Sequence, residues 1–355
     1  MLIKRKEVCV MIGKLQQIPE WDNGLNLRVD MLLQQEGIQR DENLDYTCGI
    51  FDDEGNLIAT GSCFSNTLRC LAVAKEHRHK GLMKRIVAHL TEVQKERGND
   101  HLFMYTKVTS APYMKSFYEI ARVGNELVFM ENTPDGFADY CADLAKTYRE
   151  GERVAGIVMN ANPFTNGHLH LVEKAASEND VLHLFILSEE AGPIPFAVRR
   201  RLVHAGVAHL PNVICHDSGP YIVSSATFPS YFLKDGDLII RTQAALDLRV
   251  FGRIAQTLGI KRRYVGQELT SHVTRLYNQV MLEELPKMGM ECIEIPRLES
   301  DDRIISASTV RQAIHDDKLD TIREMLPPST YEFFTSEESE PIRAAIKAEE
   351  NVIHY

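Results

Sequence analysis

The second half of the chain alternates short apolar runs with amphipathic segments. The apolar runs are continuous, as in strands buried on both faces of a sheet, and they cover residues 153–159, 181–187, 212–216, 237–242, 262–266 and 291–296. Helical spacing of apolar positions marks the segments between them, at 168–178, 196–210, 245–259 and 273–289. This alternation predicts an α/β domain with a doubly wound parallel sheet, whose ligands bind at the carboxyl ends of the strands.

The first half mixes strand and helix periods over roughly 130 residues, which predicts a smaller α+β domain. Helices are expected at residues 30–38, 81–98 and 111–121, the second of them ended by Gly98. Strands are expected in a hairpin over 45–64 that turns at Asp53–Asn56, and at 67–76, 101–107 and 125–131.

Pro134, Asp135 and Gly136 form a cluster of turn residues between the two halves. The resulting organisation has a first domain, a polar linker helix, a second domain and an acidic C-terminal tail, over residues 1–133, 134–152, 153–330 and 331–355. A chain of 355 residues accommodates two domains of usual size. The tail could pack on the second domain or meet a partner, and the sequence leaves both open.

Composition and charge exclude several classes of protein. The formal net charge of −10 argues against a general binder of nucleic acid or anionic membranes, because both favour a basic surface. No apolar run approaches the ~20 residues of a membrane span, and the apolar stretch near the N-terminus is too short for a signal peptide. The seven cysteines include no CxxC pair and the thirteen histidines no HExxH spacing. We therefore expect reduced thiols, a cytoplasmic location and no structural metal site.

The apolar run at 153–159 is followed by NANPFTNGH, residues 160–168, which holds more polar donors than a turn requires. A helix that begins there offers free backbone N–H groups and about half a positive charge, so its start can bind phosphate oxygens. Gly167 lets the backbone approach closely, and Thr165 and His168 can stabilise charge that develops on a phosphoryl group. The alternative is a plain capped helix, with Asn166 as the cap and His168 exposed.

A second helix start lies in IISASTVR, residues 304–311. Ser306 or Ser308 suits its N-cap position. Arg311 then falls near the first turns of the helix, where the helix dipole disfavours a cation. A bound anion would resolve that conflict, because serine hydroxyls, backbone N–H groups and the guanidinium would converge on it. The alternative is a surface arginine that extends into solvent.

Together the two stretches resemble the paired T/HxGH and ISSTxxR motifs of the nucleotidyltransferase superfamily, whose Rossmann-like domain joins a nucleotide to an acceptor and releases pyrophosphate. The resemblance implies that Thr165, His168 and Arg311 are catalytic, with Arg311 also on the β- and γ-phosphates. Ala307 replaces a serine of the usual motif. Residues that the resemblance places around the nucleotide are Asn162, Phe164, Gly167, Gly266, Glu268, Ser306, Ser308 and Thr309.

Three further polar side chains could line the same site: His170, Arg199 and Lys234. For His170, a core position that covers the sheet is the simpler interpretation. The arginine run at 199–201 reads in part as a solvated helix face.

Three more stretches, at 219–235, 242–251 and 264–281, extend the resemblance over nearly the whole chain, to the [citrate (pro-3S)-lyase] ligase family. Membership implies an AMP-forming acid–thiol ligase that uses ATP, Mg²⁺ and acetate to make acetyl-AMP. It would then acetylate the thiol on the CoA-like prosthetic group of the citrate lyase acyl carrier protein. Neither nucleic acid nor a membrane is expected among its partners.

In the first domain, the basic run from His77 to Gly81 resembles the pyrophosphate loop of the GNAT acetyltransferase fold. The resemblance implies that Arg78 and Gly81 contact the CoA-like arm, and that Tyr118, on a helix, lies near the acetyl group. The alternative is a solvated basic turn with Tyr118 in the core. Whether this domain transfers the acetyl group or only docks the arm stays open, as do the oligomeric state and the strictness for acetate.

Two other functions remain possible from the sequence. One is a small-molecule adenylyltransferase, with a pantetheine phosphate or a mononucleotide as the acceptor, which the presence of the first domain disfavours. The other is a non-catalytic module that senses nucleotide and CoA, which the complete set of Thr165, His168, Ser306 and Arg311 disfavours.

Overall fold

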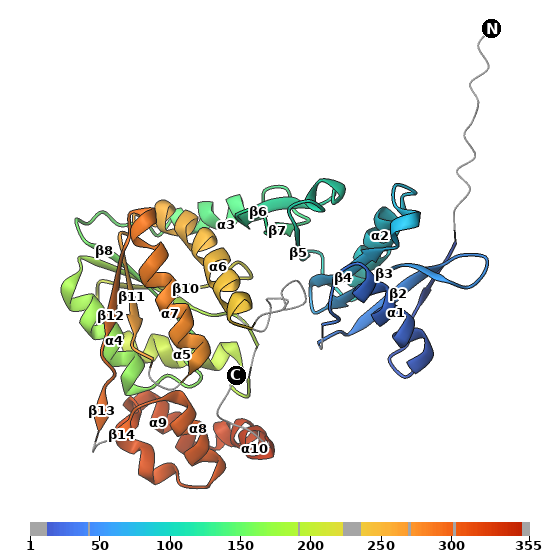
Figure 1. Ribbon diagram of the computed structural model, residues 1–355. Coiled ribbons are helices and arrows are strands. Elements are labelled where there is room, and N and C mark those ends of the chain that lie inside the picture. The colour runs from blue at the N-terminus through green and yellow to red at the C-terminus, as the bar shows by residue number, and fades with distance from the viewer. Residues whose placement is uncertain are drawn as a thin grey trace. The chain divides into compact units, whose positions relative to one another are not determined.

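The computed structural model describes residues 13–41, 43–190, 192–222, 236–268, 271–300 and 303–349 (Figure 1). The chain divides into two compact units, the first comprising Met1–Gly136 and Thr227–Ile239, the second Phe137–Ala226 and Ile240–Tyr355. Lys234 lies outside the described residues. Over the described ranges, no helix combines the length and the apolar character needed to cross a membrane.

The first unit is built on a seven-stranded mixed sheet with the order β1-β2-β3-β4-β5-β7-β6. Its strands are β1 (Lys14–Gln17), β2 (Tyr46–Phe51), β3 (Leu57–Phe64), β4 (Thr67–Val73), β5 (Phe103–Lys107), β6 (Tyr118–Val123) and β7 (Leu127–Glu131). Neighbouring strands pair antiparallel except β4 and β5, which pair in parallel. That parallel ladder joins only residues 67–68 to residues 103–104, so it ends after two residue pairs.

Two helices cover this sheet, α1 (Asn23–Gln35) and α2 (Leu82–Glu96). The helix α2 buries Leu82, Ile86 and Leu90, whose four-residue spacing places them on one face. Ile50 packs in the core cluster of α2, whereas the next residue, Phe51, packs in that of α1. Because successive side chains of a strand point to opposite faces, the two helices cover opposite sides of the sheet. The short helix η1 (Lys75–His77) precedes α2.

The helix expected at residues 111–121 is wrong. Only the turn η2 (Ala111–Tyr113) is helical there, and Tyr118 begins β6 and pairs antiparallel with Glu131 of β7. The apolar spacing of this segment fits a helix, but short apolar segments are ambiguous and the edge of the sheet supplies hydrogen-bond partners for a strand. Tyr118 is 44% exposed on β6, so it lies neither on a helix nor in the core.

The second unit is built on a five-stranded parallel sheet with the order β10-β9-β8-β11-β12. Its strands are β8 (Val154–Met159), β9 (Val181–Ile186), β10 (Val213–Asp217), β11 (Arg262–Gly266) and β12 (Glu291–Ile295). The chain runs outward from β8 to β10 and then returns to β11 on the other side of β8. The predicted doubly wound α/β sheet is confirmed, and the order of its strands reverses between β8 and β11.

Helices lie around this sheet, and those of the C-terminal part gather at one end of it (Figure 1). They are α3 (Gly136–Ala145), α4 (Asn166–Glu178), α5 (Phe196–Val207), α6 (Gly236–Leu258), α7 (His272–Glu284), α8 (Ala307–His315), α9 (Pro328–Thr335) and α10 (Glu340–Ala348). Short helices are η4 (Pro286–Met288), η5 (Leu319–Met325) and η6 (Glu337–Ser339), and a small ribbon pairs β13 (Glu299–Ser300) with β14 (Arg303–Ile304).

The strand expected at residues 237–242 is also wrong. These residues form the first turns of α6, which continues without a break to Leu258. A short apolar run cannot be assigned to strand or helix by periodicity alone. Here Leu246 and Val250 follow Thr242, the last residue of the run, at helical spacing, and all three are buried.

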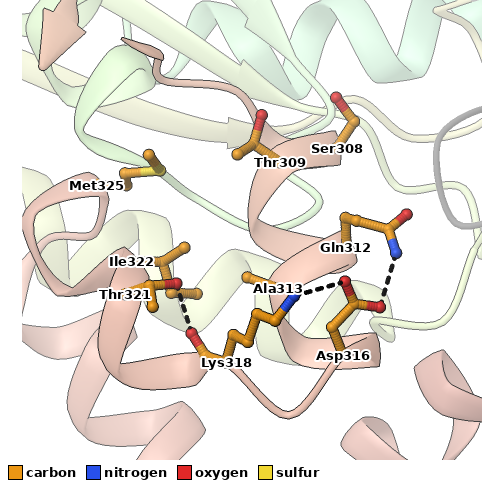
Figure 2. Close-up of a pocket in the computed structure, with 9 residues that line it drawn as sticks. All are labelled: Ser308, Thr309, Gln312, Ala313, Asp316, Lys318, Thr321, Ile322 and Met325. Atoms are coloured by element: carbon orange, nitrogen blue, oxygen red, sulfur yellow. Dashed lines mark hydrogen bonds and ion pairs between the residues drawn. The ribbon is translucent and has the colours of Figure 1, made fainter. Parts of the chain in front are cut away.

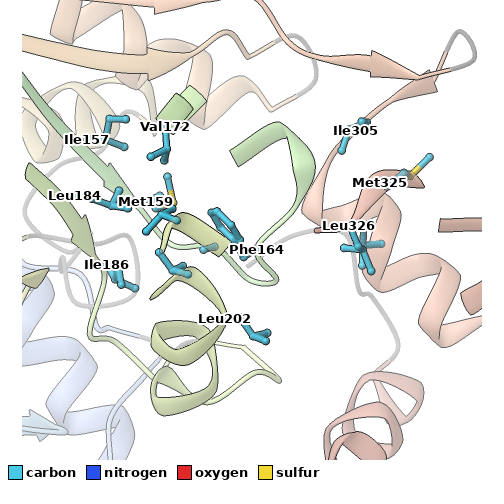
Figure 3. Close-up of a cluster of buried hydrophobic side chains, with 14 of the residues drawn as sticks. Ile157, Met159, Phe164, Val172, Leu184, Ile186, Leu202, Ile305, Met325 and Leu326 are labelled. Carbon is cyan, nitrogen blue, oxygen red and sulfur yellow. The ribbon is translucent and has the colours of Figure 1, made fainter. Parts of the chain in front are cut away.

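The core of the second unit lies between the sheet, α4 and α5, and extends to the C-terminal helices (Figure 3). Ile157 and Leu184 from the strands belong to the same cluster as Val172 from α4. Phe334 of α9 and Ile346 of α10 are fully buried in that cluster. The described part of the C-terminal tail therefore packs on the second unit.

Candidate active site

The first element of the site is the segment that leaves β8, residues 160–165, with the first turn of α4. Thr165 has extended backbone angles (φ −114°, ψ 168°) and is the N-cap of α4. Its hydroxyl accepts a hydrogen bond from the backbone N–H of His168 (3.4 Å), and Nδ1 of His168 accepts one from the N–H of Thr165 (3.1 Å). This reciprocal pair is a capping box. The cap is thus Thr165 and not Asn166, whose side chain donates to the Glu324 carbonyl (2.9 Å).

The capping box determines the tautomer of His168. A backbone N–H can only donate, so Nδ1 must accept, and in the neutral ring Nε2 carries the proton. His168 is half-buried rather than exposed. Its removal from water, together with the positive charge of Arg297, lowers the pKa of His168 to about 4. At neutral pH the residue is therefore an uncharged Nε2–H donor.

The start of α4 packs closely against the segment that precedes α8. A β-carbon on Gly167 would lie 3.1 Å from the carbonyl oxygen of Ile305, so a larger residue would displace one of the two segments. The ring of Phe164 stacks on His168, with centroids 5.9 Å apart and 20° between the planes. Phe164 and Asn162 are 0% and 3% exposed, which places their side chains beneath the loop and not on its solvent side.

The second element is the first turn of α8. Ser306 is its N-cap, and the Ser306 hydroxyl accepts a hydrogen bond from the backbone N–H of Thr309 (3.1 Å). The same hydroxyl lies 2.9 Å from that of Ser308 and 2.8 Å from that of Thr309. Of the two serines that could cap the helix, the structure selects Ser306. Three hydroxyl groups gather where the helix also leaves backbone N–H groups without intrahelical partners.

Arg311 joins the two elements. Its Nη1 donates a hydrogen bond to the carbonyl oxygen of Asn162 (2.5 Å). The residue is only 5% exposed, so the interpretation as a surface arginine that extends into solvent is wrong. Desolvation lowers the pKa of Arg311 to about 10, against the opposing effect of Glu349, and the guanidinium stays charged at neutral pH. The structure thus brings the starts of α4 and α8 together.

Gly266 and Glu268 lie at and just beyond the carboxyl end of β11, the neighbour of β8. Glu268 accepts a hydrogen bond from the N–H of Ser271 (3.1 Å) and forms an ion pair with Arg297. The charge of Arg297, which follows β12, also acts on His168. Sequence reasoning missed Arg297, because no motif or spacing marks it. Glu268 was expected beside the nucleotide. Its carboxylate is paired with Arg297, at the same edge of the sheet.

An open pocket of about 360 Å³ lies beside α8 and η5 (Figure 2). Its lining residues come from α8, η5 and the turn between them: Ser308, Thr309, Gln312, Ala313, Asp316, Lys318, Thr321, Ile322 and Met325. At one end, Ser308 and Thr309 belong to the hydroxyl cluster, so the pocket borders the first turn of α8. The hydroxyls and the helix N-terminus at this end of the pocket are suited to phosphate oxygens.

The other expected residues lie in the first unit, in the loop before α2. Gly81 is the N-cap of α2 in the left-handed conformation (φ 76°). Arg78 has a half-exposed side chain and forms an ion pair with Glu36. The ring of His79 meets that of Tyr113 edge-on, with centroids 6.5 Å apart. This loop is exposed and so remains accessible to an anionic ligand.

The folds and the site define a chain with a mixed α+β first unit and a second unit whose parallel sheet carries two joined helix starts at one edge. The acetyltransferase (GNAT) family model matches residues 15–124, and the model of the citrate lyase ligase C-terminal domain matches residues 154–334. The [citrate [pro-3S]-lyase] ligase of Haemophilus influenzae is 34% identical over 313 residues, which cover 86% of this chain and 93% of the relative.

Two further relatives agree. The [citrate [pro-3S]-lyase] ligase of Klebsiella pneumoniae is 33% identical over 312 residues, covering 86% of this chain and 91% of the relative. The [citrate [pro-3S]-lyase] ligase of Escherichia coli K12 is 35% identical over 306 residues, which cover 83% of this chain and 87% of the relative. The chain belongs to the citrate lyase ligase family, and the family resemblance of its sequence is confirmed.

Proposed function

We propose that this ligase uses ATP to activate acetate as acetyl-AMP, with release of pyrophosphate. It then passes the acetyl group to the prosthetic-group thiol of the citrate lyase acyl carrier protein. The observation that carries the proposal is the hydrogen bond from Arg311 to the Asn162 carbonyl, which joins the starts of α4 and α8 at one edge of the sheet. Both helix starts are of the kind that binds phosphate.

ATP suits this edge because its triphosphate is a chain of anions. The first N–H groups of α4 and the Nε2–H of His168 would hydrogen-bond the α-phosphate and stabilise the charge that develops there. The hydroxyls on the first turn of α8 would hold the β- and γ-phosphates, with Arg311 supplying positive charge. Buried Phe164 and Asn162 would hold the shape of the loop from below and make no direct contact.

The chemistry needs no protein nucleophile. In the first step an acetate oxygen attacks the α-phosphorus, the bond to the bridging oxygen of the β-phosphate breaks, and pyrophosphate leaves with its electron pair. In the second step the carrier thiolate attacks the acetyl carbon, the bond from that carbon to the phosphate oxygen breaks, and AMP leaves. The cysteines of the second unit suit this scheme, because desolvation raises the pKa of Cys215 and Cys292 to about 11 and disfavours thiolates.

Mg²⁺ would enter as part of the ATP complex. Over the ranges that the structure describes, no group of three or more His, Cys, Asp or Glu side chains is placed to hold a metal ion. Mg²⁺ commonly keeps several waters and binds through the phosphates of a substrate. The described residues do not form a dedicated cage for the ion.

The first unit would recognise the CoA-like arm of the carrier without transferring the acetyl group. Its exposed loop with Arg78 and Gly81 offers a helix N-terminus to the phosphates of the arm. Only η2 is helical between β5 and β6, and Tyr118 lies on an edge strand. The helix that would have carried Tyr118 toward an acetyl group is therefore replaced by a turn and a strand, which favours docking over catalysis.

The test is acetate-dependent exchange of labelled pyrophosphate into ATP by the purified chain without its partner. His209, an exposed residue paired with Glu173 (3.0 Å), supplies the control His209→Ala. We expect exchange to require acetate and Mg²⁺, to fall about a hundredfold or more in His168→Ala, and to persist in the control.

Exchange supported by a pantetheine phosphate or a mononucleotide, and not by acetate, would replace the ligase with a small-molecule adenylyltransferase. Absence of exchange with every acceptor, also after addition of the carrier protein, would overturn the proposal in favour of a nucleotide-binding module.

A further inference from the structure

Arg199, in the first turn of α5, is fully buried and surrounded by backbone oxygens. Its Nε donates to the Ile194 carbonyl (3.1 Å), and its Nη1 lies 2.8 Å from the Leu187 carbonyl. The same Nη1 lies 2.8 Å from both the carbonyl and the side-chain oxygen of Asn160, and Nη2 donates to the Glu189 carbonyl. The acceptors are thus four carbonyls and one amide oxygen.

Burial of a cation at the start of a helix is unfavourable on two counts, the loss of hydration and the direction of the helix dipole. Five hydrogen bonds offset this cost, and the planar fork of arginine is suited to separate acceptors in a way that a lysine ammonium is not. The next two arginines behave differently. Arg200 and Arg201 are half-exposed and pair with Asp217 (2.8 Å) and Glu338 (2.8 Å). The run of three arginines is therefore one buried clamp and two surface residues.

The acceptors show what Arg199 holds. Leu187 and Glu189 follow β9, and Asn160 is the first residue after β8, five positions before Thr165. Arg199 therefore ties together the loops that leave two adjacent strands at their carboxyl ends. Arg311 holds the same loop at a second point, the carbonyl of residue 162. The segment that ends in the capping box is thus held at two positions by buried guanidinium groups.

We propose that Arg199 is a positioning residue for the adenylylation step. It holds the loop of residues 160–165 so that His168 presents its Nε2–H at the point where the phosphate reacts. The proposal rests on the proposed function, because it assumes that His168 acts on the α-phosphate. In this role Arg199 does not contact the substrate, whereas a residue that lines the site would.

The test compares Arg199→Lys with Arg200→Lys, the adjacent surface arginine, and with Asn160→Ala, which removes one acceptor. Correct folding of each variant is checked by its melting temperature. In pyrophosphate exchange, Arg199→Lys is expected to lower kcat about ten- to hundredfold, since misplacement by about 1 Å can cost that much. The KM for ATP should stay within about threefold of wild type, because ground-state binding changes little. Arg200→Lys should match wild type.

A double-mutant cycle separates positioning through contact from a general loss of structure. If Arg199 acts through Asn160, the combined variant should lose less activity than the product of the two single losses. Multiplicative losses, or a fall in Arg200→Lys as large as in Arg199→Lys, would overturn the proposal. If Arg199→Lys does not fold, Asn160→Ala alone must still lower kcat at unchanged KM.

A spectroscopic measurement is independent of activity. In protein labelled with [¹⁵N]histidine, the ring nitrogens of His168 should report the Nε2–H tautomer in wild type and in Arg200→Lys, and a shifted or averaged state in Arg199→Lys and Asn160→Ala. An unchanged His168 signal in both of these variants would refute the positioning role. If wild type shows no acetate-dependent exchange at all, the proposed function fails, and this signal still decides whether Arg199 positions His168.

Discussion

A pair of buried histidines in the second unit makes its stability depend on pH. A hydrogen bond joins Nδ1 of His183 in β9 and Nε2 of His216 in β10 (2.8 Å), and the two residues are 0% and 6% exposed. Desolvation lowers the pKa of each ring from 6.5 to about 4, with the charges of His216 and Arg149 adding to the effect at His183. The perturbation is the replacement of both rings by leucine, which removes the titrating groups at similar volume.

The expected effect follows from proton linkage. Between pH 6.5 and pH 4 the unfolded chain binds protons at these positions and the folded chain does not, so the free energy of unfolding falls as the pH falls. For one such ring the loss between pH 7 and pH 5 is roughly 2 kcal/mol. Two independent rings would lose about 4 kcal/mol, and coupling between them brings the expected loss to about 2–4 kcal/mol.

The assay is hydrogen exchange, read by mass spectrometry on peptides that contain β9 and β10 and corrected for the intrinsic rate at each pH. Wild type should lose about 2–4 kcal/mol more of local opening free energy between pH 7 and pH 5 than the double leucine variant. His209→Leu, which changes an exposed histidine, should behave as wild type. Equal losses in wild type and in the double variant would refute the reasoning.

Three further substitutions test individual features of the structure by urea unfolding, and Thr165→Val is also tested by pyrophosphate exchange. Thr165→Val removes the hydroxyl that caps α4, and we expect a loss of about 1 kcal/mol together with reduced pyrophosphate exchange, because one of the two hydrogen bonds that fix His168 is lost. Unchanged stability and unchanged pyrophosphate exchange would contradict the assignment of the cap. Gly167→Ala places a β-carbon 3.1 Å from the Ile305 carbonyl oxygen and should cost about 1–3 kcal/mol, whereas a neutral result would show that the two segments separate easily. Gly81→Ala meets no neighbouring atom, so the left-handed backbone alone should lower the stability of the first unit by about 1 kcal/mol.

Much of the fold could be predicted from the sequence, because the five parallel strands are continuous apolar runs separated by amphipathic helices. The failures were short segments in which apolar spacing fits two structures. Residues 237–242 are apolar enough for a strand. The buried positions that follow continue at helical spacing, so these residues form the first turns of α6. Residues 111–121 have helical spacing, yet the edge of β7 pairs with Tyr118 and the residues after it.

The candidate site, like the fold, was predicted from the sequence only in part. Local chemistry predicts the two helix starts, because cap residues and glycine act within one turn of chain. It does not choose between neighbouring caps, since Thr165 and Asn166 both suit the position and the backbone angles decide. It suggested Arg199 only as a side chain that could line the site, and it did not find Arg297. The contacts of both residues come from loops distant in sequence and depend on the completed sheet. Residues that shape a site from beneath carry no motif.

The most direct test of the central claim follows an oxygen atom. The chain, its carrier protein, ATP and acetate labelled with ¹⁸O in both oxygens are allowed to react, and the AMP that forms is analysed by mass spectrometry. If acetate attacks the α-phosphorus, each AMP receives one ¹⁸O when the thiol displaces it from acetyl-AMP, and the product in His168→Ala forms far more slowly. Unlabelled AMP, or ADP and phosphate in place of AMP and pyrophosphate, would contradict an acetyl-adenylate formed at this site.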